Sequence, residues 1–251
     1  MKDIGLKALF LLLLVAGWQV IVALEIWPDY LLPPPGQVAS TLNTGIASGD
    51  YLLATGASLK RLAIGYALSV VLGISLGLLV ARSRLAEKTS GTLILGLRTL
   101  PSVCWMPLAL LWFGLDDTSI IFVTVAGSLP SITSATQTSI RQIPPLWVRA
   151  GRNMGATGSK LYLHVLLLAA LPTVFEGMRQ GWSFAWRSLM GGELLFVTAG
   201  LGHLLNMGRE LNDMSQVLAV MILIVAIGLV TEGLLFSVAE KKLAARWGFK
   251  H

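Results

Sequence analysis

The sequence is poor in charged residues, in cysteine and in histidine. Only 13% of its 251 residues are Asp, Glu, Lys or Arg, whereas soluble domains carry about 25%. The single cysteine, Cys104, excludes an internal disulfide and leaves too few thiols for a cysteine-based metal site. The histidines, His164, His203 and His251, stand far apart and form no H-E-x-x-H or similar ligand set. These shortages exclude a disulfide-stabilised scaffold and argue against a metalloenzyme.

Motifs of hydrolysis and nucleotide binding are also missing. The sequence contains no G-x-S-x-G elbow and no evident Ser-His-Asp constellation. Residues 155–160 superficially resemble a phosphate loop, but they lack the G-x-x-x-x-G-K-[ST] spacing and no strand precedes them. We therefore expect a protein without a catalytic centre of its own, and no metal site.

Long apolar runs dominate what remains. The chain is 55% hydrophobic, with a mean hydropathy of +0.73. A bilayer admits only helices or a closed barrel, because backbone polar groups must be satisfied internally, and these runs are too long for barrel strands. The sequence predicts an all-α, polytopic membrane protein that forms one domain over residues 1–251. Its six expected helices cover about residues 8–24, 62–81, 92–115, 118–140, 161–195 and 217–238.

Three of these helices contain interruptions. Arg98, Pro101 and Pro107 interrupt the third, and Pro130 interrupts the fourth. Pro172 makes a break possible in the fifth. The first run is longer than a usual signal core and no small-x-small cleavage site closes it, so we expect a retained first helix.

The basic residues predict an orientation. With the N-terminus in the cytoplasm, thirteen of the 19 lysines and arginines fall in inside segments and three outside. Both termini are therefore predicted to be cytoplasmic. Clustering at the ends of apolar runs marks cytoplasmic loops rather than nucleic-acid binding. Lys60 and Arg61 fit this orientation poorly, because they are basic and fall at the outer interface, and we expect them to snorkel outward.

Two further patterns concern packing. After the proline run 33–35, the residues Val38, Leu42 and Ile46 recur every four positions, which favours an amphipathic helix on the outer surface; a plain loop is the alternative. Small residues also stand at every fourth position of the second apolar run, a pattern that lets another helix approach closely. They are Gly65, Ser69, Gly73, Gly77 and Ala81.

Residues 141–160 form a basic, glycine-punctuated segment ahead of the fifth apolar run. Pro144 and Pro145 can begin a helix, since its first turn needs no N–H from them. Residues 147–154 are predicted to be helical, and Gly155 suits the left-handed residue that ends a helix. Ser159 can cap the helix that follows. An ordinary interhelical loop is the alternative.

Charged residues within the apolar runs need a reason, because they are costly in a bilayer. Arg98, Arg179, Arg187 and Glu193 are such residues. They can pair between helices, or they can line a path for an anionic substrate; Glu176 lies three positions before Arg179 and can pair with it. For Arg98 and Arg187 we favour the pathway, since neither has an opposite charge one helical turn away.

Several motifs, in order, resemble those of one family. The run Val148-Arg-Ala-Gly-Arg-Asn-Met-Gly-Ala-Thr157, followed by Leu171-Pro172 and Gly177, resembles the "EAA" loop of ABC importer permeases. Arg149 and Gly151 depart from the motif, replacing its Glu and its second Ala. Residues 98–114, Ala185-Trp186 with Glu193, and residues 32–38 resemble segments of permeases for nitrate, taurine and aliphatic sulfonates. The resemblance covers about residues 31–240.

The resemblance implies a type I permease subunit of an ABC importer in a bacterial inner membrane, with a cytoplasmic coupling helix. It implies a second permease subunit, most simply a copy of this chain, two ATPase subunits that bind ATP and Mg²⁺, and an extracytoplasmic binding protein; no cofactor is expected in this chain. The solute would be a small anion such as nitrate, a sulfonate or taurine. The residues expected to couple to the ATPase are Trp147, Arg149, Ala150, Arg152, Met154 and Gly155. A stand-alone secondary transporter or channel, and an intramembrane enzyme, are the alternatives.

Overall fold

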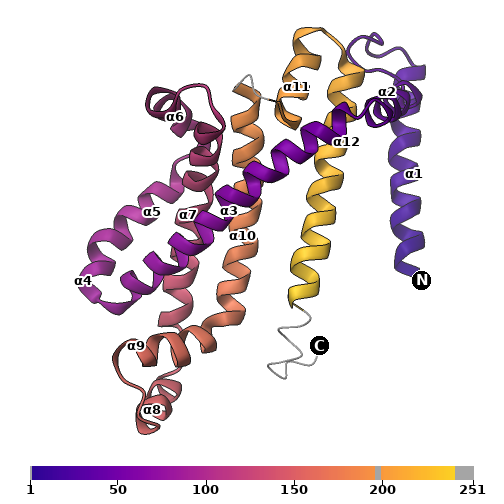
Figure 1. Ribbon diagram of the computed structural model, residues 1–251. Helices are drawn as coiled ribbons and strands as arrows, with labels where there is room; N and C mark the ends of the chain where they lie inside the picture. The colour runs from indigo at the N-terminus through magenta and orange to yellow at the C-terminus, as the bar shows by residue number, and fades with distance from the viewer. Residues whose placement is uncertain (1, 196–198, 241–251) are drawn as a thin grey trace. The chain divides into compact units, whose positions relative to one another are not determined.

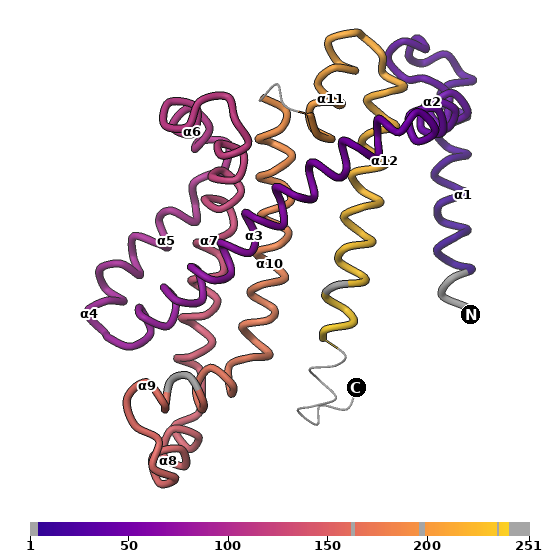
Figure 2. The backbone as a smooth tube through the Cα atoms, viewed as in Figure 1, coloured from indigo at the N-terminus to yellow at the C-terminus, as the bar shows by residue number. Residues whose placement is uncertain are grey.

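The computed structural model describes residues 2–195 and 199–240 (Figure 1). Within these ranges every regular element is a helix, as predicted, and no strand occurs. The chain divides into two compact units, Met1–Ser58 with Ala199–Ile227 and Leu59–Thr198 with Gly228–His251. The tube in Figure 2 lets the reader follow the chain through both.

The first unit contains the helix that the sequence predicts after the proline run. It contains α1 (Lys2–Ala23), α2 (Pro35–Ala47), the first turns of α3 (Asp50–Arg82), α11 (Leu201–Glu210) and most of α12 (Met214–Thr231). Pro35 occupies the first turn of α2, where a missing N–H costs nothing. The expected helix is confirmed, and Val38 and Leu42 pack in one cluster with Tyr51 and Val220, whereas Ile46, the third residue of the predicted apolar face, is exposed. Its place on the outer surface stays a prediction. The sequence did not predict α11.

The second unit is built around α7. Its elements in chain order are the rest of α3, α4 (Arg84–Ala86), a π-helical turn (Glu87–Gly91), α5 (Thr92–Thr99), a 3₁₀ turn (Ser102–Trp105), α6 (Met106–Phe113), α7 (Asp117–Arg141), α8 (Pro145–Asn153), α9 (Gly158–Leu161), a second π-helical turn (Tyr162–Leu166), α10 (Leu167–Leu195), and the end of α12 with a third π-helical turn (Glu232–Phe236). Helices α7 and α10 run side by side (Figure 1).

Five helices in the described residues are long and apolar enough to cross a membrane, and a bent pair would make a sixth. The five are Gly5–Ala23, Asp50–Arg82, Asp117–Arg141, Gly158–Leu195 and Met214–Glu240. The pair Arg84–Thr99 and Ser102–Phe113 is bent by 103°. The third predicted helix, about residues 92–115, is therefore broken at Pro101, which is one of the interruptions visible in the sequence. Pro101 forces Leu100 into an extended conformation (φ −75°, ψ 122°), because its ring excludes the helical conformation of the preceding residue.

The small residues of α3 allow another helix to approach closely, as predicted, and the structure identifies that helix as α7. A Cβ atom on Gly77 would lie 2.6 Å from Cβ of Thr136 and 2.8 Å from the carbonyl oxygen of Thr133. The contacting pairs advance by four residues along both helices in the same direction, so α3 and α7 run parallel. They are Gly65 with Thr124, Ser69 with Ser128, Gly73 with Ile132 and Gly77 with Thr136. Close approach here replaces side-chain volume with backbone contact, the packing that small residues permit between membrane helices.

Helix α10 packs on α7 in the opposite direction. Gly177 approaches Ala135, Gly181 approaches Ile132, and Gly192 approaches Ile120, so positions rise on one helix as they fall on the other. A Cβ on Gly177 would overlap the Cβ of Ala135 at 2.2 Å. Helix α7 is thus held by glycine contacts from α3 and from α10, and α5 and α6 also pack against it.

Candidate functional site: an elbow and two polar cavities

The basic segment forms the elbow that the sequence predicts. Helix α8 begins with Pro145, and the residue after its cap, Gly155, has φ +83°. The N–H of Ala156 donates to the carbonyl of Gly151 at 3.0 Å, which closes the helix end. A Cβ on Gly155 would meet nothing within 4 Å, so the requirement for glycine comes from the backbone alone. The next helix begins at Gly158, so Ser159 lies inside its first turn and the predicted Ser159 cap is wrong.

One side of α8 is packed against the rest of the unit. Gly151 is buried, and a Cβ there would lie 3.0 Å from Cδ1 of Leu161 and 3.1 Å from the methyl groups of Val165. Val148 joins the apolar cluster that contains Ile140 and Leu161. The motif's second alanine is therefore replaced by glycine at the position where α8 has the least room.

The predicted coupling residues lie on the rest of α8 and just after it, and they are exposed. Trp147 is 52% and Met154 is 86% exposed, large values for apolar side chains. We call this surface the elbow face. Its residues are Leu146, Trp147, Arg149, Ala150, Arg152 and Met154, all exposed. It combines aromatic and thioether surface with two guanidinium groups.

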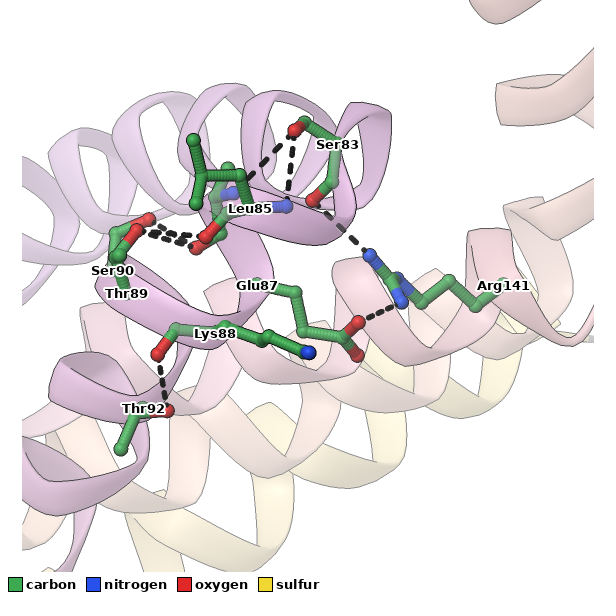
Figure 3. A network of polar contacts seen from close by, with 9 residues as sticks. Ser83, Leu85, Glu87, Lys88, Thr89, Ser90, Thr92 and Arg141 are labelled. Atoms are coloured by element: carbon green, nitrogen blue, oxygen red, sulfur yellow. Dashed lines mark hydrogen bonds and ion pairs between the residues drawn. The ribbon is translucent and has the colours of Figure 1, made fainter.

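Arg141, in the last turn of α7, connects the elbow end of the unit to the α3–α4 turn. Its guanidinium donates hydrogen bonds to the carboxylate of Glu87 and, at 3.4 Å, to the carbonyl of Ser83 (Figure 3). The Ser83 hydroxyl accepts from the N–H groups of Leu85, at 3.2 Å, and Ala86, and so caps α4. Sequence reasoning counted Arg141 only as a cytoplasmic charge, because Glu87 lies far away in the chain.

A polar cavity of about 610 Å³ opens between α5, α7 and α10. We call it the larger cavity. Arg98 from α5, several hydroxyls from α7 and α10, and the charged residues Glu176, Arg179 and Glu232 line it. The hydroxyl-bearing residues are Ser134, Thr138, Ser139, Thr173 and Ser183.

The smaller cavity, about 310 Å³, surrounds the break at Pro101. Arg98 and Arg187 both line it, together with Ser102 and Ser188, and its lining includes no acidic residue. Arg98 lines both cavities. The structure thus brings together two of the four predicted pathway residues in one small space.

Arg98 and Arg187 form no salt bridge with any residue that the structure describes. The guanidinium of Arg187 lies 4.8 Å from the centre of the Phe184 ring, and its Nε donates to the carbonyl of Ser183 at 3.1 Å. Stacking on an aromatic face holds a guanidinium in place and leaves its outer N–H groups available.

Arg179 has a different environment. Its guanidinium lies 3.0 Å from Glu232, 3.6 Å from Glu176 and 3.7 Å from Glu240. The sequence predicted the Glu176 pair, whereas the other two carboxylates come from the region that follows α12. With three acidic neighbours, the positive charge of Arg179 is more than balanced. Its place in a pathway stays a prediction.

Glu193 is fully buried and lines neither of these cavities. It pairs at 2.8 Å with Arg61, which also contacts Asp117 at 2.7 Å. The prediction that Arg61 snorkels outward is wrong, since its side chain is only 6% exposed. Two carboxylates from α7 and α10 lie within its reach, and pairing with them offsets the cost of burying its charge. Whether Glu193 also belongs to the pathway stays a prediction.

Comparison with known proteins places this geometry in a family. Residues 69–243 match the family described as binding-protein-dependent transport system inner membrane component. The chain is 27% identical to the taurine transport system permease protein of Escherichia coli over 92% of its own length and 86% of that protein. It is 32% identical to a putative aliphatic sulfonates transport permease protein of the same organism, over 86% of this chain and 82% of the other.

A solved structure supports the fold. A chain from the crystal structure of an amino acid ABC transporter with histidines superposes with a TM-score of 0.63, covering 82% of this chain and 97% of that one at 17% identity. The apolar helices, the elbow and the match over most of the chain agree with one another: the protein belongs to the family of binding-protein-dependent transport system inner membrane components, and it is a multi-pass permease subunit of an ABC importer.

Proposed function

We propose that this permease forms the translocation pathway for a small oxyanion, with a sulfonate as the best candidate. The observation that carries the proposal is the smaller cavity, which Arg98 and Arg187 both line and to whose lining no acidic residue contributes. An unpaired anion crossing a dry helical interior costs several kcal/mol. Two guanidinium groups offset part of that cost and grip oxyanion oxygens in a fork.

The relatives support the same chemistry. Two of them are named for taurine and for aliphatic sulfonates, and both kinds of compound carry a sulfonate group. The hydroxyls of Ser102 and Ser188 beside the arginines could donate further hydrogen bonds to such a group. Nitrate is the smaller alternative, and it would use the same donors.

The elbow face would couple the permease to its ATPase. Arg149 and Arg152 lie three positions apart and share one face, so they suit an acidic groove on the partner. Trp147 and Met154 would bury apolar surface there, while Ala150 leaves room for close approach and Gly155 sets the turn. Arg149 stands where the family motif has Glu, so the partner surface should be acidic at that point. ATP and Mg²⁺ would bind the ATPase, and this chain would pass the movement of the ATPase to the translocation pathway.

The assembly would contain two permease chains, most simply two copies, with two ATPase subunits and one extracytoplasmic binding protein. The whole chain would act as one permease domain, with the elbow and both termini in the cytoplasm. The basic residues of the elbow end support this orientation.

Side-specific cysteine labelling tests the orientation. In a Cys104→Ser background, Arg84→Cys should react only from the cytoplasmic side. Asn43→Cys, at an exposed position of α2, should react only from outside. Reaction of Arg84→Cys with an impermeant reagent added to intact cells would reverse the assignment.

Reconstitution tests the function. The permease, its genetically linked ATPase and the purified binding protein are placed in proteoliposomes, and uptake of radiolabelled taurine, an alkanesulfonate and nitrate is measured. We expect uptake of at least one oxyanion that needs ATP and the binding protein. Uptake without the ATPase would instead favour a stand-alone transporter or channel. ATP-driven uptake of a cation alone would contradict the oxyanion assignment.

A further inference from the structure

The contact between Arg141 and Glu87 joins the end of α7, which leads into α8, to the π-helical turn that leads into α5. Arg141 ends α7, and only residues 142–144 separate α7 from α8. The N–H of Gln142 donates to the carbonyl of Thr138 at 3.0 Å. The N–H of Trp147 donates to the carbonyl of Pro144, also at 3.0 Å. This short, bonded linker leaves little slack, so a displacement of α8 reaches the guanidinium of Arg141.

The other side of the contact leads to the cavities. Glu87 begins the π-helical turn, α5 follows at Thr92, and Arg98 stands in the last turn of α5. The hydroxyls of Thr89, Ser90 and Thr92 each donate to a carbonyl of the preceding turn (Figure 3). Glu87 and α5 therefore lie in one uninterrupted helical stretch, through which a displacement at Glu87 would reach α5.

The break at Pro101 leaves the far end of α5 free to follow. Because α5 and the helix after it meet at 103°, α5 can tilt without carrying all of α6 with it. A tilt of α5 moves Arg98, which lines both cavities. Arg141 reaches Glu87 in this segment (Figure 3). By its place in the chain, Glu87 lies at the end of α5 opposite the break.

We propose that Arg141 is a positioning residue that links α8 to α5 and thereby sets where Arg98 stands relative to the two cavities. The inference rests on the proposed function, since it gives the coupling of ATP hydrolysis to transport a physical route through named residues. Arg141 touches no substrate in this scheme. It acts through Glu87, Ser83 and α5.

The pair suits this role better than a purely structural one. The side chains of Arg141 and Glu87 are 30% and 38% exposed, and ion pairs at such partly exposed positions contribute little to stability. Loss of the pair should therefore leave the fold and the complex intact. A change in the amount of solute moved per ATP hydrolysed would then report on transmission.

Charge reversal with rescue tests the inference in the reconstituted complex. Arg141→Glu and Glu87→Arg should each lower solute transported per ATP hydrolysed several-fold, with normal binding of the ATPase subunit. The double variant should recover a substantial part of the ratio, because the pair is re-formed with its charges exchanged. Lys88→Glu is the matched control: it also reverses one charge, in the same turn as Glu87 and at an exposed position, and it should keep the wild-type ratio.

A distance measurement gives a second, independent readout. Spin labels at Asn153 on α8 and Leu95 on α5, both exposed and placed in a Cys104→Ser background, should report a distance change on ATP binding. Arg141→Gln should suppress the movement of Leu95 against a label on α10 while α8 still responds. Wild-type ratios in both single variants, no rescue in the double variant, or an α5 that does not move with ATP would each overturn the inference. If the wild-type complex shows no ATP-driven uptake at all, the proposed function fails instead.

Discussion

The guanidinium of Arg61 lies 2.8 Å from the carboxylate of Glu193, although 132 positions separate the two residues along the chain. Both side chains are buried, and Asp117 completes the arrangement from the start of α7. Three helices, α3, α7 and α10, are therefore joined by charge at one end and by glycine contacts along their lengths. This end of the unit is built to stay together.

Removing one partner of the pair should destabilise the protein. Glu193→Ala removes the buried one of the two carboxylates that pair with the buried Arg61, and breaking such a pair costs about 3–5 kcal/mol. We expect a lower midpoint of thermal unfolding in detergent and a lower yield. The double variant Arg61→Met with Glu193→Met should recover most of the loss, because no buried charge remains unpaired. A single variant as stable as the wild type would show that the pair does not hold these helices.

Adding one methyl group to α3 should destabilise the protein at Gly77 but not at Gly56. Gly77→Ala places a Cβ 2.6 Å from Thr136 and 2.8 Å from a backbone oxygen, so it should destabilise by about 1–3 kcal/mol. Gly56→Ala, in the same helix, meets nothing within 4 Å and should be neutral or stabilising by about 0.5–1 kcal/mol. Thermal unfolding of both variants checks the difference. Equal effects would mean that α3 and α7 are not in close contact.

A bulky residue at the elbow should disturb coupling without blocking insertion. Gly155→Val requires a β-branched residue at φ +83°, which costs about 1–2 kcal/mol or more. We expect a normal amount of protein in the membrane but weaker coupling of ATP hydrolysis to uptake. Gly155→Asn is the control, since Asn tolerates the left-handed conformation, and it should retain most of the coupling. Normal coupling in the valine variant would remove the backbone of Gly155 from the mechanism.

The two cavity arginines should matter to transport rather than to assembly. Arg98→Met and Arg187→Met should lower uptake strongly, while the binding protein keeps its affinity for the solute. The lysine variants keep the charge but lose the fork, so they should be affected less. Arg84→Met, an exposed position outside both cavities, serves as the control. Normal uptake in both cavity methionine variants would leave the oxyanion pathway without support from these side chains.

Sequence reasoning succeeded where the cause is local. The left-handed turn at Gly155 follows from the residue type after a short helix, and the stripe of small residues on α3 follows from a four-residue spacing. Both features are present. Neither depends on knowing which distant segment lies nearby, and only the identity of the partner, α7, had to come from the structure.

Sequence reasoning failed where the outcome depends on which distant segments pack around a residue. Pro101 and Pro130 look alike in the sequence, yet Pro101 breaks its helix and Pro130 lies inside α7. Pro130 is buried in α7, which packs against both α3 and α10, whereas Pro101 is exposed beside a cavity. The partners of Arg61, and the Glu232 and Glu240 partners of Arg179, were missed for the same reason, because these carboxylates come from distant parts of the chain.

The hydroxyl groups of α7 have a consequence for how the protein is made. Four of them donate to a carbonyl of the preceding turn of α7 itself: those of Thr124, Ser128, Thr133 and Ser139. Even so, α7 is the least apolar of the five candidate spans and half of it is buried, so it is poorly suited to sit alone in lipid. Its parallel neighbour α3 is synthesised first and can already be in the bilayer when α7 leaves the ribosome. Its antiparallel neighbour α10 follows after the elbow. The order of helices along the chain thus gives the most polar span a partner at the moment of its insertion.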